Sequence, residues 1–208
     1  MDIGGVIKAP FQDPEWLKKI LLMGLVNMLI CFTVVGIFVG IPNMYGWGVT
    51  FARGRMNGDT NLPPFGFGYI GLGYRAIVAG LSLIPLALVV GIVAFVVMFI
   101  FAKIHLQIVG GLLDLVIYIA FLPISFSAMY RFVVHDDMAA GLRFGWLFQF
   151  AMGNIGTIIM AVITMIIVAI LQTLMGIVPI VGGFFGFGFG VAAIMAIYAE
   201  MARVTNRA

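Results

Sequence analysis

The sequence predicts an all-α integral membrane protein, a helical bundle formed by a single domain over residues 1–208. Its residues are 63% hydrophobic and only 9% charged, and the mean hydropathy is +1.20. Soluble domains carry about 25% charged residues, so this chain lacks the polar side chains that a water-facing surface needs. Long uncharged stretches separate small clusters of basic residues, as expected of helices that cross a membrane.

The basic residues predict how the chain lies across the membrane. Cytoplasmic loops carry an excess of Lys and Arg, and ten of the eleven such residues can be placed on one side. Only Lys103 falls at the opposite end of an apolar stretch. We therefore expect both termini in the cytoplasm, and no continuous basic face that would bind nucleic acid. The ten residues are Lys8, Lys18, Lys19, Arg53, Arg55, Arg75, Arg131, Arg143, Arg203 and Arg207.

Four stretches have the length of full transmembrane helices, for which a crossing needs roughly 20 apolar residues. Two of them are joined by a tight turn at Lys103–Gln107. The uncharged run from Phe144 to Ala199 is long enough to cross twice, with a turn near Gly176–Pro179. The four predicted helices span residues 76–102, 104–130, 154–176 and 180–202.

The first apolar stretch, residues 20–52, follows a cytoplasmic or interfacial N-terminus over residues 1–19. As one helix it would extend about 50 Å, well beyond a hydrocarbon core of about 30 Å. A single crossing would also separate the N-terminal lysines from the other basic residues. We predict instead a re-entrant or kinked hairpin of short helices. Its bend is expected between Val35 and Asn43, where two glycines and a proline weaken a helix.

The hairpin prediction reveals an internal repeat. Small and aromatic residues followed by an arginine recur where the chain leaves three apolar stretches, at Arg53, Arg131 and Arg203. Repeats of helical hairpins build transport sites in some membrane proteins. Duplication of a stable unit is the simpler interpretation.

Amphipathic segments are expected in the membrane interface. Residues 138–150 place apolar side chains at helical spacing, and Asp136 or Asp137 can cap such an interfacial helix. All three tryptophans fall near the basic side of the membrane, where aromatic residues anchor the depth of a helix. These interfacial anchors are Trp16, Trp47 and Trp146.

Asp114 is the carboxylate inside a predicted span. A charge at the membrane centre costs about 2.5–3.5 kcal/mol on insertion scales, so such residues usually face the bundle interior and often mark a pathway. A structural hydrogen bond to a neighbouring helix is the simpler interpretation of Asp114. A third interpretation is that its carboxylate reaches toward the end of the span near Lys103.

Glycines recur every four residues in the last span, at Gly182, Gly186 and Gly190. Small residues at this spacing allow helix backbones to approach closely. The glycines therefore predict a helix-packing surface, either within the bundle or as an oligomer interface with another subunit.

Neither catalysis nor a cofactor is predicted. His135 and its neighbouring aspartates have no second His or Cys nearby in the sequence to complete a metal site. Ser125 and Ser127 have no nearby base, and no glycine-rich phosphate loop follows a strand. We therefore expect no enzyme activity, no metal site and no cofactor.

Several short motifs resemble the family of domain of unknown function 4013. Asp13–Lys19 opens the first apolar stretch, and Asn57-Gly58-Asp59 leads to Leu62-Pro63-Pro64. The resemblance continues in Asp136–Gly141, Asn154 and Tyr198-Ala199, and so covers nearly the whole chain. It implies a multi-pass protein of a prokaryotic cytoplasmic (inner) membrane and supplies no reaction. Phe65–Gly68 departs from the family, which usually has a Trp- and acid-containing stretch there.

These observations predict a non-enzymatic structural or assembly subunit. Short loops leave little to fold in water, so its partners are expected to be membrane lipids and copies of itself or other membrane subunits. The alternative is a small permease or channel with Asp114 in or near the pathway. A water-accessible cavity that reaches Asp114 favours the alternative, and a solidly packed bundle favours assembly.

Overall fold

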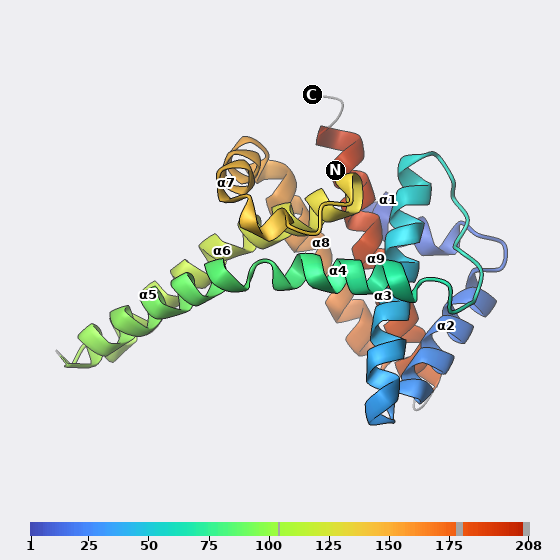
Figure 1. Cartoon of the computed structure of the whole chain (residues 1–208), viewed down its shortest axis with the longest axis horizontal. Helices are drawn as coiled ribbons and strands as arrows, with labels where there is room; N and C mark the ends of the chain where they lie inside the picture. Colours follow the sequence, from blue (N-terminus) through green and yellow to red (C-terminus); the bar gives the residue numbers. More distant parts are fainter. Residues whose placement is uncertain (104, 178–180, 206–208) are drawn as a thin grey trace.

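The computed structural model describes residues 1–103, 105–177 and 181–205, and the regular elements in these ranges are all helical (Figure 1). This confirms the predicted all-α class. Residues 104 and 180, which begin two predicted helices, lie outside the described ranges. So do Val178 and Pro179 of the predicted turn, and Arg207. Among the described residues, five segments are long and apolar enough to cross a membrane: Val34–Met56, Ile70–Lys103, Ile108–His135, Ile155–Met175 and Gly182–Thr205.

The helices follow one another with short connections, apart from a longer loop between α3 and α4. In order they are α1 (Ile3–Lys8), the 3-10 turn η1 (Ala9–Phe11), α2 (Trp16–Cys31), α3 (Val34–Met56), α4 (Ile70–Leu81), α5 (Ile84–Lys103), α6 (Gln107–His135), the 3-10 turn η2 (Ala140–Leu142), α7 (Phe144–Gly153), α8 (Ile155–Met175) and α9 (Val181–Thr205).

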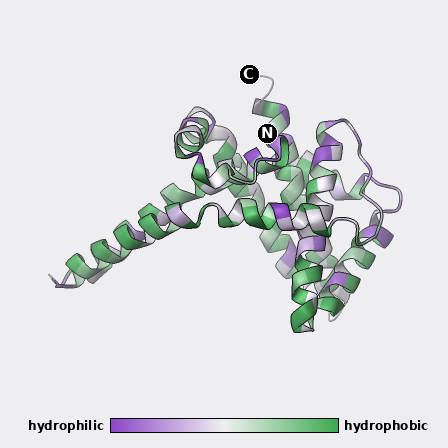
Figure 2. Ribbon diagram, in the orientation of Figure 1, coloured by the Kyte–Doolittle hydropathy of each residue, from purple (hydrophilic) through white to green (hydrophobic). Residues whose placement is uncertain are grey.

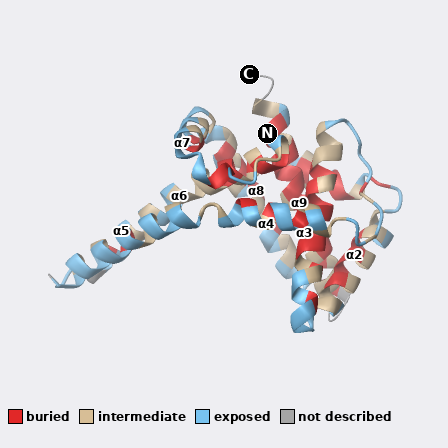
Figure 3. Ribbon diagram, in the orientation of Figure 1, coloured by how far each residue is buried: buried red, intermediate tan, exposed pale blue. Residues whose placement is uncertain are grey.

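The core lies where α2, α3 and α8 pack around α9. Figure 3 shows the buried residues gathered along α3 and α9. Close approach of backbones depends on glycine: a Cβ added to Gly24 of α2 would overlap the carbonyl of Phe184. One added to Gly188 of α9 would lie 2.6 Å from the carbonyl oxygen of Ile20. The two helices therefore cross with backbone against backbone, as small residues permit in membrane bundles.

The N-terminal stretch forms a hairpin, but its bend lies earlier than predicted. The chain turns at Phe32 and Thr33, and the Thr33 hydroxyl accepts the N–H of Gly36 at 2.9 Å to cap α3. From there α3 continues for 23 residues, so the bend expected between Val35 and Asn43 and the short second helix are both wrong.

Packing explains why the glycines and the proline of α3, which disfavour a helix, do not break it. A Cβ at Gly40 would lie 2.7 Å from the carbonyl oxygen of Asn27, so this glycine lets α3 approach α2. Pro42 lacks the N–H that would bond the carbonyl of Phe38. The hydroxyl of Tyr74 in α4 donates to that carbonyl oxygen instead, at 2.6 Å.

The predicted single helix over 76–102 is also wrong, because the chain breaks at Ser82 and Leu83 between α4 and α5. Pro85 lies in the first turn of α5, where a missing N–H is tolerated, but it cannot donate to the carbonyl of Leu81 as a continuous helix would require. The break is then held from outside: the N–H of Gly141 in η2 donates to the Ser82 hydroxyl at 2.8 Å. Gly141 packs so closely that an added Cβ would lie 2.5 Å from the backbone of Leu83.

The helices α5 and α6 pack against each other and project away from the bundle as an arm (Figure 1). This arm, residues 84–122, is hydrophobic along nearly its whole length (Figure 2) and exposed on most of it (Figure 3). Together with α2–α3 and α8–α9 it completes a set of three helical hairpins in the described part of the chain. Each hairpin ends in one arginine of the internal repeat.

The interfacial segment differs in detail from the predicted helix over 138–150. A 3-10 turn precedes α7, which begins only at Phe144. Neither Asp136 nor Asp137 caps α7, whose N-cap residue is Arg143 without a side-chain bond. The reason is distance, since α7 begins seven residues after Asp137; Oδ1 of Asp137 instead accepts the N–H of Ala139 at 3.1 Å.

Candidate functional site

An arginine–aspartate network forms where α6 ends, next to the C-terminal end of α3. Asp136 follows α6 in the left-handed conformation, with φ of 58°. Its Oδ1 accepts from Nη2 of Arg53 at 2.9 Å, and its Oδ2 is bound by Arg75 of α4. One carboxylate thus joins three helices that are far apart in the sequence.

Arg53 also closes the C-terminus of α6. Its Nε donates to the carbonyl of Val133 at 3.0 Å, and its Nη2 donates to that of Phe132 at 3.2 Å. The carbonyl of Phe132 also accepts the N–H of Asp136, so Arg53 is a second donor to it. The guanidinium also stabilises the partial negative charge that the last carbonyls of a helix carry.

Asp137 repeats the pattern with a second pair of arginines. Its Oδ2 accepts from Nε of Arg131 at 2.8 Å and forms an ion pair with Nε of Arg143 at 2.5 Å. The hydrogen bond from Arg131 lowers the pKa of the Asp137 carboxyl, against the opposing effect of burial, and Arg143 lowers it further. Arg131 also stacks over Trp146, 4.4 Å from the ring centroid. The network therefore sets four guanidinium groups on two carboxylates.

A second polar cluster holds the loop between α3 and α4 against α2. Asp13 is 2% exposed, and its Oδ2 accepts from Nζ of Lys19 at 2.6 Å and from the N–H of Leu62 at 2.7 Å. Burial raises the pKa of the Asp13 carboxyl, but hydrogen bonds from Lys19, Glu15 and Leu62 together hold it below its ordinary value.

The same loop is fixed to α3 by two further bonds. Nε1 of Trp47 donates to the carbonyl of Pro63 at 2.9 Å. The Asn43 amide donates to the carbonyl of Gly66 and to Oδ1 of Asn27, each at 3.0 Å. Asn43 was not singled out from the sequence, although an amide inside an apolar stretch is costly unless it is bonded.

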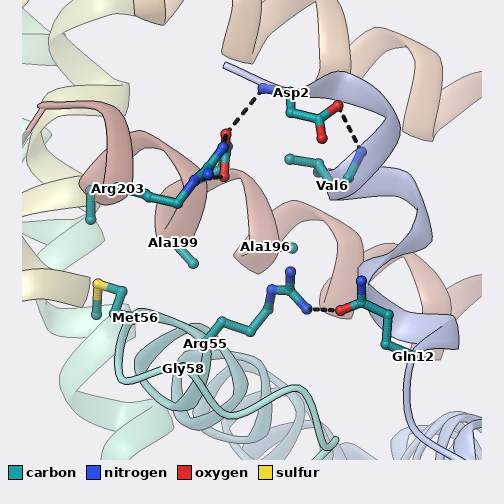
Figure 4. Close-up of a pocket in the computed structure, with 12 residues that line it drawn as sticks. Asp2, Val6, Gln12, Arg55, Met56, Gly58, Ala196, Ala199 and Arg203 are labelled. Atoms are coloured by element: carbon teal, nitrogen blue, oxygen red, sulfur yellow. Dashed lines mark hydrogen bonds and ion pairs between the residues drawn. The ribbon is translucent and has the colours of Figure 1, made fainter. Parts of the chain in front are cut away.

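A polar cavity of about 600 Å³ lies between the two chain ends and α3 (Figure 4). Arg55 points into it and donates to the Gln12 side chain at 2.7 Å. On the opposite wall, Glu200 accepts the N–H of Asp2 at 3.0 Å and pairs with Arg203 at 2.6 Å. The N-terminus and the end of α9 therefore lie at the same end of the bundle.

Asp114 lies in the arm, away from both clusters. Gly110, one turn earlier on the same face of α6, packs against Phe101 of α5. Oδ1 of Asp114 is buried and has no hydrogen-bond partner among the described residues. Asp114 lines neither the polar cavity nor the open hollow of about 460 Å³ beside Gln172.

The glycines of α9 lie against α8 of the same chain. The amide of Gln172 donates to the carbonyl of Gly186 at 3.0 Å, and a Cβ on Gly190 would overlap the Gln172 side chain. Gly182 is buried as well. These positions show packing within the chain, whereas an oligomer interface at the three glycines stays a prediction.

The tryptophans occupy three different environments. Trp47 is fully buried in α3, where the loop at Pro63 covers it, and its role as an interfacial anchor stays a prediction. Trp16 is half-buried and packs edge-on against Phe11 at 4.9 Å. Trp146 is half-buried between Arg131 and Phe150.

In the described ranges, no three His, Cys, Asp or Glu residues lie together where they could hold a metal ion. The fold and its polar clusters instead define a helical membrane protein built from apolar hairpins. Residues 29–181, well over half of the chain, match the family described as "Protein of unknown function (DUF4013)". The chain belongs to this family, which confirms the resemblance, although the match excludes Asp13–Lys19 and Tyr198-Ala199. No curated protein and no solved structure matches the chain.

Proposed function

We propose that this protein is a non-enzymatic structural subunit that assembles with copies of itself in a prokaryotic cytoplasmic membrane, with both termini in the cytoplasm. The basic residues at one end of the apolar segments support this orientation. The proposal also covers assembly with other membrane subunits into a larger complex.

The observation that carries the proposal is the unpartnered carboxylate oxygen of Asp114 in an exposed apolar arm. Lipid alone can cover the apolar side chains of α5 and α6, so their exposure by itself indicates no protein partner. A carboxylate is different, because in hydrocarbon it needs a hydrogen-bond donor or a cation.

The arm also offers room for a neighbouring helix beside this carboxylate. Gly111 lies one turn before Asp114 and is exposed, with nothing within 4 Å of an added Cβ. A small residue at this place lets another helix backbone approach closely.

A second copy of the chain supplies the matching chemistry. Along the described middle of the arm the polar side chains are Asp114, an acceptor, and Tyr118, which carries a hydroxyl donor and is 51% exposed. In an interface with two-fold symmetry, every contact occurs twice: if one residue of the first copy contacts another residue of the second copy, the same two residues also meet with the copies exchanged. Oδ1 of Asp114 is covered within its own chain, so two arms side by side can exchange Tyr118–Asp114 hydrogen bonds through the other carboxylate oxygen, Oδ2.

Native mass spectrometry from lipid nanodiscs tests this assembly. We expect a defined homo-oligomer for the wild type, and a shift toward monomer for Asp114→Leu and for Gly111→Leu. Gly156→Leu is the matched control, since Gly156 is also exposed with open space around it but lies on α8. A wild-type monomer that purifies without other subunits would overturn the proposal.

The alternative function is a small permease or channel in which Asp114 lies in or near the pathway. The internal repeat and the same carboxylate oxygen favour it. If the wild type is monomeric and Asp114→Asn abolishes a proton or ion flux in reconstituted vesicles, this alternative replaces assembly.

A further inference from the structure

We propose that Arg75 and Arg143 bind the phosphate group of an anionic phospholipid at the corner formed by Asp136 and Asp137. The two arginines reach adjacent carboxylates from different elements, Arg75 from α4 and Arg143 from the start of α7. No ligand role follows from the family for any of these residues.

Charge balance is the first argument. The inner arginines, Arg53 and Arg131, have side chains 30% and 18% exposed and already occupy both carboxylates. Arg75 and Arg143 are 45% and 54% exposed and add two further positive charges. The corner therefore carries a surplus of two positive charges over its carboxylates.

Geometry is the second argument. Arg75 is bound to Asp136 through Nη2, and Arg143 to Asp137 through Nε. A guanidinium has five N–H donors in a planar fork, so a single ion pair leaves most of the fork facing away from the carboxylate. Guanidinium forks match phosphate oxygens well, and basic corners between membrane helices recognise lipid headgroups.

Apolar neighbours favour a lipid over a soluble phosphate compound. Arg143 stands between Leu142 and Phe144, which are 52% and 44% exposed. Arg75 lies one turn before Val78, which is 47% exposed. Exposed apolar residues therefore flank each arginine along the chain, and an acyl chain can pack on them while the headgroup binds the arginines.

Lipid retention measured by native mass spectrometry tests the site. The protein is released from nanodiscs of equal parts phosphatidylglycerol and phosphatidylcholine, and we expect it to retain phosphatidylglycerol preferentially. Arg75→Gln/Arg143→Gln should weaken this retention, by about fivefold for each arginine removed. Lys8→Gln/Lys18→Gln is the control, because it removes two exposed positive charges of the predicted cytoplasmic side elsewhere in the chain.

The outcomes separate the site from its competitors. Equal retention of both lipids, or an equal loss in the arginine and lysine variants, would overturn the proposal. Displacement of phosphatidylglycerol by millimolar inorganic phosphate would overturn it in favour of a soluble phosphate ligand. Arg143→Lys, which keeps the charge but not the fork, is expected to retain lipid at an intermediate level and guards against misfolding of the glutamine variant. Because retention is compared within one oligomeric state, the result does not depend on whether the arms assemble.

Discussion

The carboxylate of Asp13 accepts a hydrogen bond from the backbone N–H of Leu62 at 2.7 Å, although the two residues are 49 positions apart in the sequence. Asp13 precedes α2 and Leu62 lies in the loop after α3, so this bond closes the N-terminal hairpin on its open side. Lys19 completes the cluster by donating to both the Asp13 carboxylate and the Leu62 carbonyl. Motifs that the family resemblance highlighted on both sides of the hairpin are thus parts of one buried cluster.

Removal of the Asp13 carboxylate should destabilise the protein strongly. Asp13→Ala leaves the ammonium of Lys19 without its partner, and breaking one side of a buried ion pair costs about 3–5 kcal/mol. We expect a clearly lower midpoint of thermal unfolding in detergent.

Glu15→Ala is the matched control for Asp13→Ala. Glu15 is an exposed carboxylate 4.0 Å from Lys18, and exposed pairs of this kind contribute about 0–1 kcal/mol. Equal unfolding midpoints for the two variants would contradict the structural role assigned to Asp13.

Acid should weaken the protein through carboxylates whose pKa is lowered in the folded state. The pKa values of Asp13 and Asp137 lie below their ordinary value, for which about 3.9 is typical. Their contribution to stability is complete above that value and is lost as the pH falls through the lower folded pKa. Unfolding midpoints measured between pH 6 and pH 3 should therefore drop at the acidic end.

Asp137→Asn should flatten this acidic drop, because the amide does not titrate. Asp59→Asn, a change in an exposed loop residue, should keep the wild-type profile. A steep acidic drop that persists in Asp137→Asn would show that other groups cause it.

Two glycines of α4 should respond oppositely to alanine. A Cβ on Gly73 would overlap the carbonyl of Pro42 in α3, whereas one on Gly71 meets nothing within 4 Å. Gly73→Ala must push α4 away from α3 and is expected to lower the unfolding midpoint by several degrees. Gly71→Ala should leave it unchanged or raise it, since alanine is favoured over glycine in a helix by up to about 1 kcal/mol. Similar effects of the two changes would argue against close packing of α4 on α3.

The orientation in the membrane is testable with single cysteines. In a Cys31→Ser background, Lys103→Cys at the end of the arm should react with a membrane-impermeant maleimide added to whole cells or spheroplasts. Lys8→Cys should react only after the membrane is permeabilised. The reverse labelling pattern would refute the cytoplasmic placement of the termini.

Apolar length and charge position are local properties, which is why the sequence was informative about the class of protein and its apolar segments. The bend at Thr33 is a local signal, because the Thr33 hydroxyl caps α3 by accepting the N–H of Gly36, three residues later. Tertiary contacts explain the other differences: Pro42 is tolerated within α3 because Tyr74 from another helix bonds the freed carbonyl of Phe38. The break at Ser82 is likewise held by Gly141, a residue of a distant segment.

The polar clusters likewise combine residues whose local role the sequence suggests with contacts that only the tertiary structure makes. From the sequence alone, Asp136 and Asp137 were interpreted as caps, which is the local use of such residues at a helix start. The structure brings arginines to them from α3, α4, α6 and the residue before α7, while Oδ1 of Asp137 also accepts the N–H of Ala139. Trp47 is similar: its position near basic residues suggests an interface, but the loop at Pro63 folds over it.

The sequence by itself determined that this chain is a helical membrane protein, which family it belongs to and which segments are apolar, because hydrophobicity is decided residue by residue. Only the tertiary structure decided that α5 and α6 stand apart as an arm, that Asp114 has a buried oxygen without a partner in the described chain, and that four arginines meet two aspartates. Those features depend on contacts between residues up to 83 positions apart, and no local pattern of the sequence records which distant side chains meet.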